Sequence, residues 1–194
     1  MGENQDLEIV KKMEELKELE EQLSLLQNTS FSSSDNRQEI DNKIGKLFSK
    51  IDLVRGEIRF LEGNPVVSNE KLDIYFDNGS MEDGYGIFEI HLHGTSNRIG
   101  YVRLIREPHN SFGNISYALD GKYRGHHFML QSLDLLKDTM LKMKIVKPII
   151  TVEPDNLASV KTIQAFGGIL TEKNNGWYDT YEVDLTEKQS PKKR

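Results

Sequence analysis

The sequence predicts an α+β protein in which an antiparallel helical hairpin precedes a mixed, mostly antiparallel sheet flanked by helices. Three observations predict it. Before Pro65, apolar residues recur at steps of three and four, which is typical of helices that pack along a seam. From Leu72 to Leu119, apolar and polar residues alternate, which is typical of half-buried strands. After Tyr123 a helical period returns, and further strands and one more helix follow it.

The first third of the chain predicts two helices. The first ends near Asn28, and its apolar residues are Ile9, Leu16, Leu19, Leu23 and Leu26. The second begins at Asp35, because Gln38 three residues later completes a capping box. Its apolar residues keep a strict heptad spacing: Ile40, Ile44, Leu47, Ile51, Val54, Ile58 and Leu61. Gly63 and Pro65 end this helix.

The two predicted helices form a coiled-coil hairpin, because only the short polar run 29–34 joins them. Each apolar seam needs a partner, and a hairpin satisfies both seams mutually. Met13 and Phe48 lie beside the seams, so a homodimer through the hairpin stays open. We interpret residues 1–64 as a structural or dimerising appendage, with docking of a specific partner as the alternative.

After Pro65 the pattern becomes that of a sheet. Leu72, Ile74 and Phe76 predict the first strand, and the polar residues 77–84 predict a turn. Later strands are expected at Ile87–His93, Ile99–Ile105, Gly113–Leu119, Pro148–Val152, after Gly168, and at Trp177–Leu185. One helix is expected on Phe128, Leu130, Leu133, Leu136, Met140 and Met143, and another from Asn156 to Phe166. Trp177 and Tyr178 are interpreted as core residues.

A strand that feeds a helix through a short basic turn is the feature most informative about function. Ile115, Tyr117 and Leu119 alternate with polar or small residues and predict that strand. The turn that follows is Tyr123-Arg124-Gly125. Such a turn aims several free backbone N–H groups at one point, and the helix dipole adds about half a positive charge there. The sequence therefore predicts an anion site, of the kind most often used for phosphates.

Composition limits the classes of function. With 194 residues the chain supports one full domain plus an appendage, and no cysteine is present for a disulfide, a thiolate metal site or a nucleophile. Residues 1–64 carry 14 acids and 9 bases, and residues 65–194 carry 17 acids and 16 bases, so neither part has the basic excess of a nucleic-acid binder. The basic tail at 187–194 is too short to change this. With no apolar signal core and no window that approaches a membrane span, we expect a cytoplasmic protein without membrane contact.

Three segments in one order carry a resemblance to a known family. They are Arg124–Met129, then Asp155–Ser159, then Gly167-Gly168. The chain resembles the GNAT superfamily of acyl-CoA N-acyltransferases from about Lys71 to Leu185, and so implies a GNAT-like sheet domain over residues 65–186. In that family the first segment holds the pyrophosphate of coenzyme A. The second follows the fifth strand, and the glycines end a helix before the sixth.

The resemblance implies an acetyl-CoA-dependent N-acetyltransferase, with acetyl-CoA as cosubstrate and an amine-bearing small molecule or protein as acceptor. The residues implied to bind the cosubstrate are Ala118, Leu119, Arg124, Gly125, His126, His127, Phe128, Met129, Asn156 and Ser159. For Asn156 a helix cap is an equally good interpretation, and the two roles can coexist. Backbone N–H groups of 117–119 are candidates to polarise the thioester carbonyl.

The residues that would move protons are Tyr117, Glu89 and His91. Glu89, His91 and His93 share one face of a predicted strand, where they suit a base, a metal patch, or the exposed polar face of an antiparallel sheet. A metal needs further ligands from another segment, and the sequence indicates none. Tyr117 is a candidate acid, although a strand tyrosine more often belongs to a core.

The chain departs from the family pattern in three ways. His127 and Met129 replace a glycine and a small residue of the pyrophosphate loop. The tyrosine that protonates the departing thiolate in many members is here Ile163, and only about ten residues separate Phe76 from Ile87, where the family has two helices. The alternative function is therefore a binding or scaffolding module of the same fold that has lost catalysis and works through the coiled coil. A phosphate-binding NTPase is disfavoured, because no Gly-Lys-Ser/Thr follows the loop.

Overall fold

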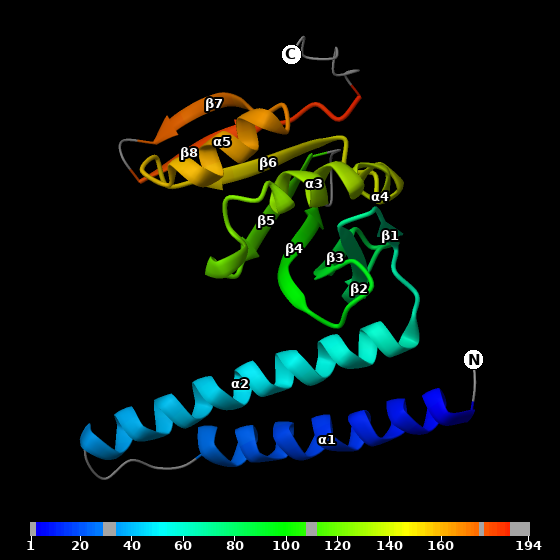
Figure 1. Ribbon diagram of the computed structural model, residues 1–194. Helices are drawn as coiled ribbons and strands as arrows, with labels where there is room; N and C mark the ends of the chain where they lie inside the picture. The colour runs from blue at the N-terminus through cyan, green and yellow to red at the C-terminus, as the bar shows by residue number, and fades with distance from the viewer. Residues whose placement is uncertain (1–2, 29–33, 108–111, 175–176, 187–194) are drawn as a thin grey trace. The chain divides into compact units, whose positions relative to one another are not determined.

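The computed structural model describes residues 3–28, 34–107, 112–174 and 177–186, so the basic tail lies outside the described residues (Figure 1). The chain divides into two compact units. One comprises Met1–Asn64 with Gly94–Arg98, and the other comprises Pro65–His93 with Ile99–Arg194. Among the described residues no helix is long and apolar enough to cross a bilayer.

The first unit contains the two predicted N-terminal helices, α1 (Glu3–Gln27) and α2 (Ser34–Glu62), which lie side by side and antiparallel (Figure 1). The buried apolar residues of α2 are Leu47, Ile51, Val54 and Ile58, four members of the heptad seam. The seam therefore buries one face of α2. The side chains of the predicted capping box at Asp35 fall outside the described residues.

Ion pairs fix how the two helices lie against each other. Lys12 Nζ lies 2.8 Å from Glu57 Oε2, and Arg55 Nη2 lies 2.8 Å from Glu20 Oε1. The hydrogen bond to Glu57, helped by one to Glu15, raises the pKa of Lys12, so the lysine keeps its charge well beyond neutral pH. Exposed pairs add little free energy each, so their main effect is to set the register that apolar burial then stabilises.

The second unit is built on an eight-stranded sheet in the order β1-β2-β3-β4-β5-β6-β8-β7. The strands are β1 (Val67–Ser68), β2 (Leu72–Ser80), β3 (Tyr85–Leu92), β4 (Arg98–Arg106), β5 (Phe112–Leu119), β6 (Lys147–Val152), β7 (Ile169–Asn174) and β8 (Tyr178–Glu182). The helices are the short 3-10 turn η1 (Gly121–Tyr123), α3 (Phe128–Leu135), α4 (Lys137–Lys142) and α5 (Leu157–Ala165). β5 and β6 pair in parallel, whereas β1–β2, β2–β3, β4–β5, β6–β8 and β7–β8 are antiparallel. The predicted fold class is confirmed.

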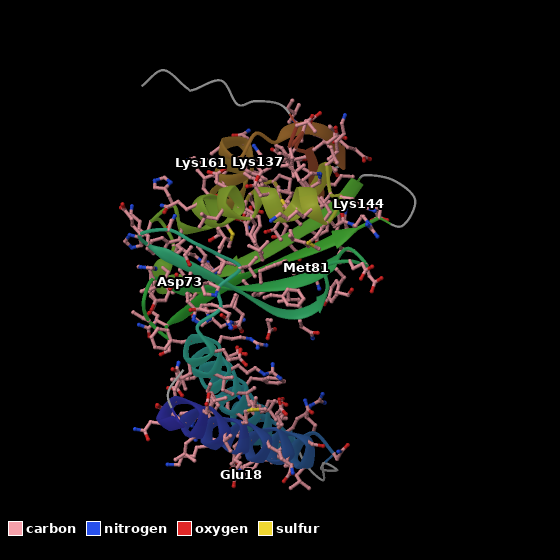
Figure 2. All side chains as sticks on the ribbon, turned by 90° about the vertical axis from the view of Figure 1, so that its right-hand side faces the viewer. Glu18, Asp73, Met81, Lys137, Lys144 and Lys161 are labelled. Carbon is pink, nitrogen blue, oxygen red and sulfur yellow. The ribbon has the colours of Figure 1, made fainter. Side chains whose placement is uncertain are left out.

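The core of this unit lies between one face of the sheet and the helices α3 to α5. Val102, Leu104 and Ile115 of the central strands belong to one apolar cluster with Leu133 of α3 and Ile163 of α5. In Figure 2, Lys137 and Lys161 mark the helical side of this layer, and Asp73 marks β2 of the sheet. Because side chains alternate along a strand, the residues between the core positions project from the opposite face.

Two predicted element bounds are corrected. The first strand does not end at Phe76: β2 continues to Ser80, because a bulge between Phe76 and Asn78 absorbs the extra residue. The helix expected up to Met143 is broken at Leu136, where the chain leaves α3 before α4 begins. One turn earlier, the Ser132 hydroxyl donates to the Phe128 carbonyl at 2.9 Å, a bond that is typical of bent helices.

The expected core packing of the last hairpin is wrong. Trp177 is 76% exposed and Tyr178 is 48% exposed. They stand at the start of β8, next to its turn, whereas the core residue of that strand is Tyr181, which is 4% exposed. The prediction from aromatic character alone was wrong because the residue of β8 that packs in the core is Tyr181, not Trp177 or Tyr178. The two-residue strand β1 also has no alternating run long enough to predict it.

Replacing Ile51 by aspartate tests the seam of α2. Ile51 is 3% exposed, so Ile51→Asp buries an unpaired charge and should lower the free energy of unfolding by at least about 3 kcal/mol. Leu53 is 55% exposed on the same helix, so Leu53→Asp is the matched control and should change stability by less than about 0.5 kcal/mol. Denaturant unfolding followed by far-UV circular dichroism measures both. Equal losses for the two variants would contradict a buried seam.

Candidate active site at the splayed strands

The two central parallel strands separate after a short pairing. β5 pairs with β6 only through Phe112–Asn114 and Lys147–Ile149, although β5 continues to Leu119 and β6 to Val152. Antiparallel neighbours hold the outer side of each strand: Leu119 lies opposite Gly100 on β4, and Val152 lies opposite Asp179 on β8. The inner edges from Ile115 and Ile150 onward have no strand partner in this pairing, so their backbone polar groups are available to a ligand.

Two helix N-termini stand at the same end of the sheet as this separation. β5 and β6 run parallel, and each is followed by a helix, α3 after β5 and α5 after β6. The starts of both helices therefore lie beyond the ends of the strands that separate. α3 and α5 also contact each other. A helix N-terminus offers free N–H groups and partial positive charge, so an anionic ligand is favoured at this end of the sheet.

The loop before α3 has the backbone that an anion cradle needs. Gly125 has φ of +82° and His127 has φ of 59°, and α3 begins at Phe128. Among the described residues, no acceptor takes the backbone N–H groups of Gly125–Met129. A Cβ on Gly125 would meet no atom within 4 Å, so the space above the loop is open. The segment fits a phosphate group.

Side chains of the same loop are partly fixed. Arg124 Nε donates to the Leu119 carbonyl at 3.2 Å, which ties the loop to the last residue of β5. The ring of His126 stacks on Phe128 with 5.6 Å between centroids. Arg124 is exposed, so its terminal guanidinium nitrogens stay accessible to an anion at the start of α3.

The start of α5 shows the capping role expected for Asn156. Its Oδ1 accepts a hydrogen bond from the Ser159 backbone at 3.2 Å. Ile163, one turn further, is completely buried, and a Cβ on Gly168 would collide with its side chain. Because Gly168 has no side chain, Ile163 packs tightly against it. Ile163 occupies the position where the family resemblance implied a tyrosine.

Tyr117 brings a different hydroxyl to this region. Its ring packs against the core cluster from β5, and its hydroxyl is buried with no hydrogen-bond partner among the described residues. Burial raises the pKa of Tyr117, and the nearby Ser159 lowers it by a smaller amount without reaching hydrogen-bond geometry. The side chain is therefore a protonated donor at neutral pH. A buried hydroxyl without a partner, next to the start of α5, points to a missing ligand.

Glu89 and His91 come together, but not beside Tyr117. His91 Nε2 lies 3.3 Å from Glu89 Oε2, and the ring of Tyr75 contacts His91 edge-on at 4.8 Å between centroids. These side chains occupy the face of the sheet opposite the core, whereas Tyr117 occupies the core face. The interpretation as an exposed polar face is wrong for Glu89 and His91, which are 2% and 0% exposed. Their mutual contact compensates part of the burial, and His91 Nδ1 is buried without a hydrogen-bond partner among the described residues.

His93 behaves as the exposed-face interpretation expected. Its side chain is 51% exposed, and Nδ1 lies 2.9 Å from Asp73 Oδ1, which also accepts a hydrogen bond from Ser68 at 2.6 Å. Within the ranges that the structure describes, no three histidine or carboxylate side chains converge as metal ligands.

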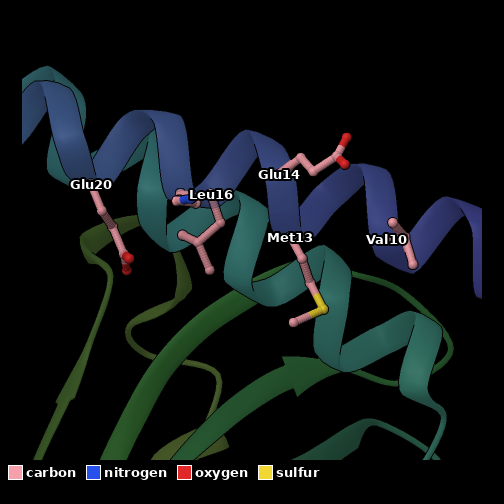
Figure 3. A pocket seen from close by; sticks show the side chains of 6 residues that line it. Val10, Met13, Glu14, Leu16 and Glu20 are labelled. Atoms are coloured by element: carbon pink, nitrogen blue, oxygen red, sulfur yellow. The ribbon is translucent and has the colours of Figure 1, made fainter.

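A separate hollow lies on the first unit. It has a volume of about 480 Å³ and is lined by Val10, Met13, Glu14, Leu16, Lys17 and Glu20, all from α1 (Figure 3). Its lining is mostly apolar and holds no histidine or nucleophile. The hollow therefore lacks the groups that acyl transfer needs, and the separated strands remain the candidate active site.

The chain is similar to known acetyltransferases. The family model of the acetyltransferase (GNAT) domain matches residues 48–169. A similar solved structure is the ribosomal-protein-S5-alanine acetyltransferase from Vibrio fischeri, 19% identical over 53% of this chain and 63% of that chain, with a TM-score of 0.46. Another is RimL, a ribosomal L7/L12 alpha-N-protein acetyltransferase in complex with coenzyme A, which is 23% identical over 52% of this chain and 62% of that chain, with a TM-score of 0.46. A third is the GNAT domain of S. lividans PAT, which is 14% identical over 56% of this chain and 65% of that chain, with a TM-score of 0.49. The chain thus covers less than two thirds of each of these chains. No curated protein matches it.

The left-handed backbone of His127 predicts a stabilising substitution. A side chain in this region costs roughly 1–2 kcal/mol, a cost that glycine avoids, so His127→Gly should raise the free energy of unfolding by about 1 kcal/mol. His126 has an ordinary φ, so His126→Gly is the matched control and should lower stability by about 0.5–1 kcal/mol. Chemical denaturation compares the two. A loss of stability in His127→Gly would show that the histidine side chain contributes more than its backbone costs.

Proposed function

Because the chain belongs to the GNAT acetyltransferase family, we propose that it transfers an acetyl group from acetyl-CoA to an amine. The observation that carries the proposal is the meeting of the separated strands β5 and β6 with the start of α3. One extended ligand with a phosphate end and a thioester end fits both features. The family match supports an acyltransferase, and the identity of the acyl group and of the acceptor is our proposal.

We assign coenzyme A to the polar groups at this end of the sheet. Its pyrophosphate accepts hydrogen bonds from the backbone N–H groups of 125–129, which are those of Gly125, His126, His127, Phe128 and Met129, and pairs with Arg124. The pantetheine arm runs along the inner edge of β5 beside Ala118 and Leu119. Asn156 and Ser159 meet the arm at the start of α5. This places the thioester near the Tyr117 hydroxyl.

The transfer needs hydrogen-bond donors to the thioester carbonyl, an acid that protonates the departing thiolate, and a base that removes the ammonium proton. The amine nitrogen attacks the thioester carbonyl carbon, the C–S bond breaks, and the sulfur leaves as a thiolate. Backbone N–H groups at the end of β5 stabilise the developing oxyanion. Tyr117 gives its proton to the thiolate, and burial, which raises the pKa of Tyr117, keeps the hydroxyl protonated until then.

Removal of the ammonium proton is assigned to the pair Glu89 and His91. An imidazole accepts a proton near neutral pH, and the adjacent carboxylate stabilises the imidazolium that forms. Both side chains are buried on the face opposite Tyr117, so this assignment requires a proton carrier between the amine and His91. The acid and the base thus act from opposite faces of one sheet.

A binding module without catalysis is the second candidate. The observation that favours it is Ile163, which fills the position of the family's tyrosine and is locked against Gly168. The direct β2–β3 hairpin, closed by the turn 81–84, also lacks the two helices that shape the acceptor side in the family. Such a module would bind the cosubstrate without turning it over.

Acetyl-CoA binding is the first test. Acetyl-CoA should stabilise the protein by about 2.7 kcal/mol at a hundredfold excess over its dissociation constant, visible as a rise in Tm. The double variant Arg124→Ala with Gly125→Asp should lose this rise, because it removes a cation and adds a carboxylate to the phosphate cradle. Gly94→Asp is the matched control, since Gly94 also has a positive φ and open space above it. No shift in the unmodified protein at millimolar acetyl-CoA would overturn the proposal.

Tyr117→Phe tests the acid. Turnover of acetyl-CoA with an acceptor amine should fall by about 10²–10⁴-fold, while binding of acetyl-CoA is kept. Because the hydroxyl has no hydrogen-bond partner among the described residues, its removal should not destabilise the fold. Tyr178→Phe removes an exposed hydroxyl and is the control. Retention of more than about half the activity in Tyr117→Phe, Glu89→Gln and His91→Gln alike would refute the assignment of all three.

A further inference from the structure

Arg103 is an exposed cation in the middle of β4. Its neighbours Val102 and Leu104 are both completely buried in the core. Alternation along the strand therefore puts Arg103 on the opposite face of the sheet, away from α3 and α5. This face is the one that the cosubstrate-binding helices leave uncovered within the second unit.

The other arginines of β4 are already engaged. Arg98 pairs with Asp52 at 3.1 Å, and Arg106 donates to the backbone carbonyls of Asp83 and Met143 at 3.3 and 3.5 Å. In the part of the chain that the structure describes, no carboxylate and no carbonyl binds Arg103. A structural role in the fold therefore explains Arg98 and Arg106, and leaves Arg103 unexplained.

One hydrogen bond holds the guanidinium of Arg103 in place. Its Nε donates to the Ser116 hydroxyl at 2.9 Å, and the two residues are direct partners across β4 and β5. The bond uses Nε and leaves the two terminal nitrogens free. A guanidinium whose stem is fixed and whose terminal nitrogens are open is suited to bind a carboxylate through two parallel hydrogen bonds.

Ser116 places this cation at the edge of the reaction site. It belongs to the part of β5, from Ile115 to Leu119, that has no pairing with β6. Next to the pair, on the same face, Tyr101 lies opposite Ala118, whose small, exposed side chain leaves the surface open. An amine that reaches the thioester from the face opposite α3 and α5 passes beside Arg103.

From this geometry we propose that Arg103, positioned by Ser116, is an acceptor subsite for a carboxylate, and that the substrate class is an amine that carries a carboxylate a few bonds from its nitrogen. The inference rests on the proposed function, because it presupposes that the amine attacks in the gap between β5 and β6. Amino acids and peptides with an acidic residue near the N-terminus belong to this class. Electrostatic attraction would favour them over neutral amines, and over amines with a second cation.

Matched amine pairs test the subsite. The pairs are γ-aminobutyrate with butylamine, and two peptides that differ only in aspartate or asparagine after the first residue. In the wild type, kcat/KM should be higher for the carboxylate member of each pair, measured as release of the CoA thiol. Arg103→Gln should lower kcat/KM for the carboxylate-bearing amine by about 10–100-fold and leave kcat/KM for the neutral amine within about twofold of the wild-type value. Lys161→Gln, which removes an exposed cation of α5 on the other face, should leave both unchanged.

Two further variants separate charge from position. Arg103→Glu should reverse the preference, so that a diamine such as putrescine is acetylated better than γ-aminobutyrate. Ser116→Ala keeps the charge of Arg103 but removes the hydrogen bond that holds its side chain in place. KM for the carboxylate-bearing amine should therefore rise several-fold while kcat stays the same. Equal changes for both members of a pair, or none, in Arg103→Gln would overturn the subsite and show Arg103 to be a solvated strand residue.

A binding measurement distinguishes failure of the subsite from failure of the proposed function. The Tm shift with acetyl-CoA is recorded for every variant, and loss of that shift in the wild type defeats the acetyltransferase proposal itself. Calorimetric titration of γ-aminobutyrate into the protein with CoA needs no turnover. Binding that Arg103→Gln abolishes supports the subsite even in a protein that acetylates no amine. Binding that is absent in the wild type, or unchanged in the variant, refutes it.

Discussion

The structure of the second unit depends on the point where β5 and β6 stop pairing. Up to Asn114 and Ile149 the two strands are joined in parallel, and beyond that point each is held only by its outer neighbour. Backbone groups that leave a ladder inside a sheet must bond to something else. The parallel direction also requires a helix after each strand, so α3 and α5 begin at the same end. The unsatisfied edge, the positive helix ends and the buried Tyr117 hydroxyl follow from one departure from regular pairing.

The two faces of the sheet divide the chemistry. On one face, α3 and α5 supply apolar packing and the loop around Gly125, so that face suits a long anionic ligand. On the other, Glu89 and His91 of β3 and Arg103 of the neighbouring strand β4 supply polar groups. A reaction in the gap between β5 and β6 has access to both faces. In the proposed mechanism the acid and the base lie on opposite faces of the sheet, as do the routes by which acetyl-CoA and the amine enter the gap.

Periodicity was sufficient to predict most elements, because burial on one face imposes a period of two on strands and 3.6 on helices. Periodicity was insufficient where a local hydrogen bond or a strained backbone determines the conformation. The bulge after Phe76, the break at Leu136 and the left-handed backbone of His127 have no periodic signal in the sequence. The loop between β5 and α3 could be predicted, since a glycine and the strand–helix order mark it, and its binding of phosphate stays a prediction. Arg103 could not, because a charged residue at an outward position is the commonest pattern in a half-buried strand, and only its hydrogen bond to Ser116 sets it apart.

The contact between Ile163 and Gly168 limits which substitutions the protein tolerates at these two positions. A tyrosine at position 163 would need room that the completely buried isoleucine and the adjacent backbone do not leave, so the single replacement meets overpacking before it can restore a hydroxyl. Position 168 is equally bound, because any side chain there collides with Ile163. The two sites are therefore coupled: a side chain at 168 needs a smaller residue at 163, and a larger residue at 163 needs glycine at 168. Related sequences should therefore show positions 163 and 168 varying together.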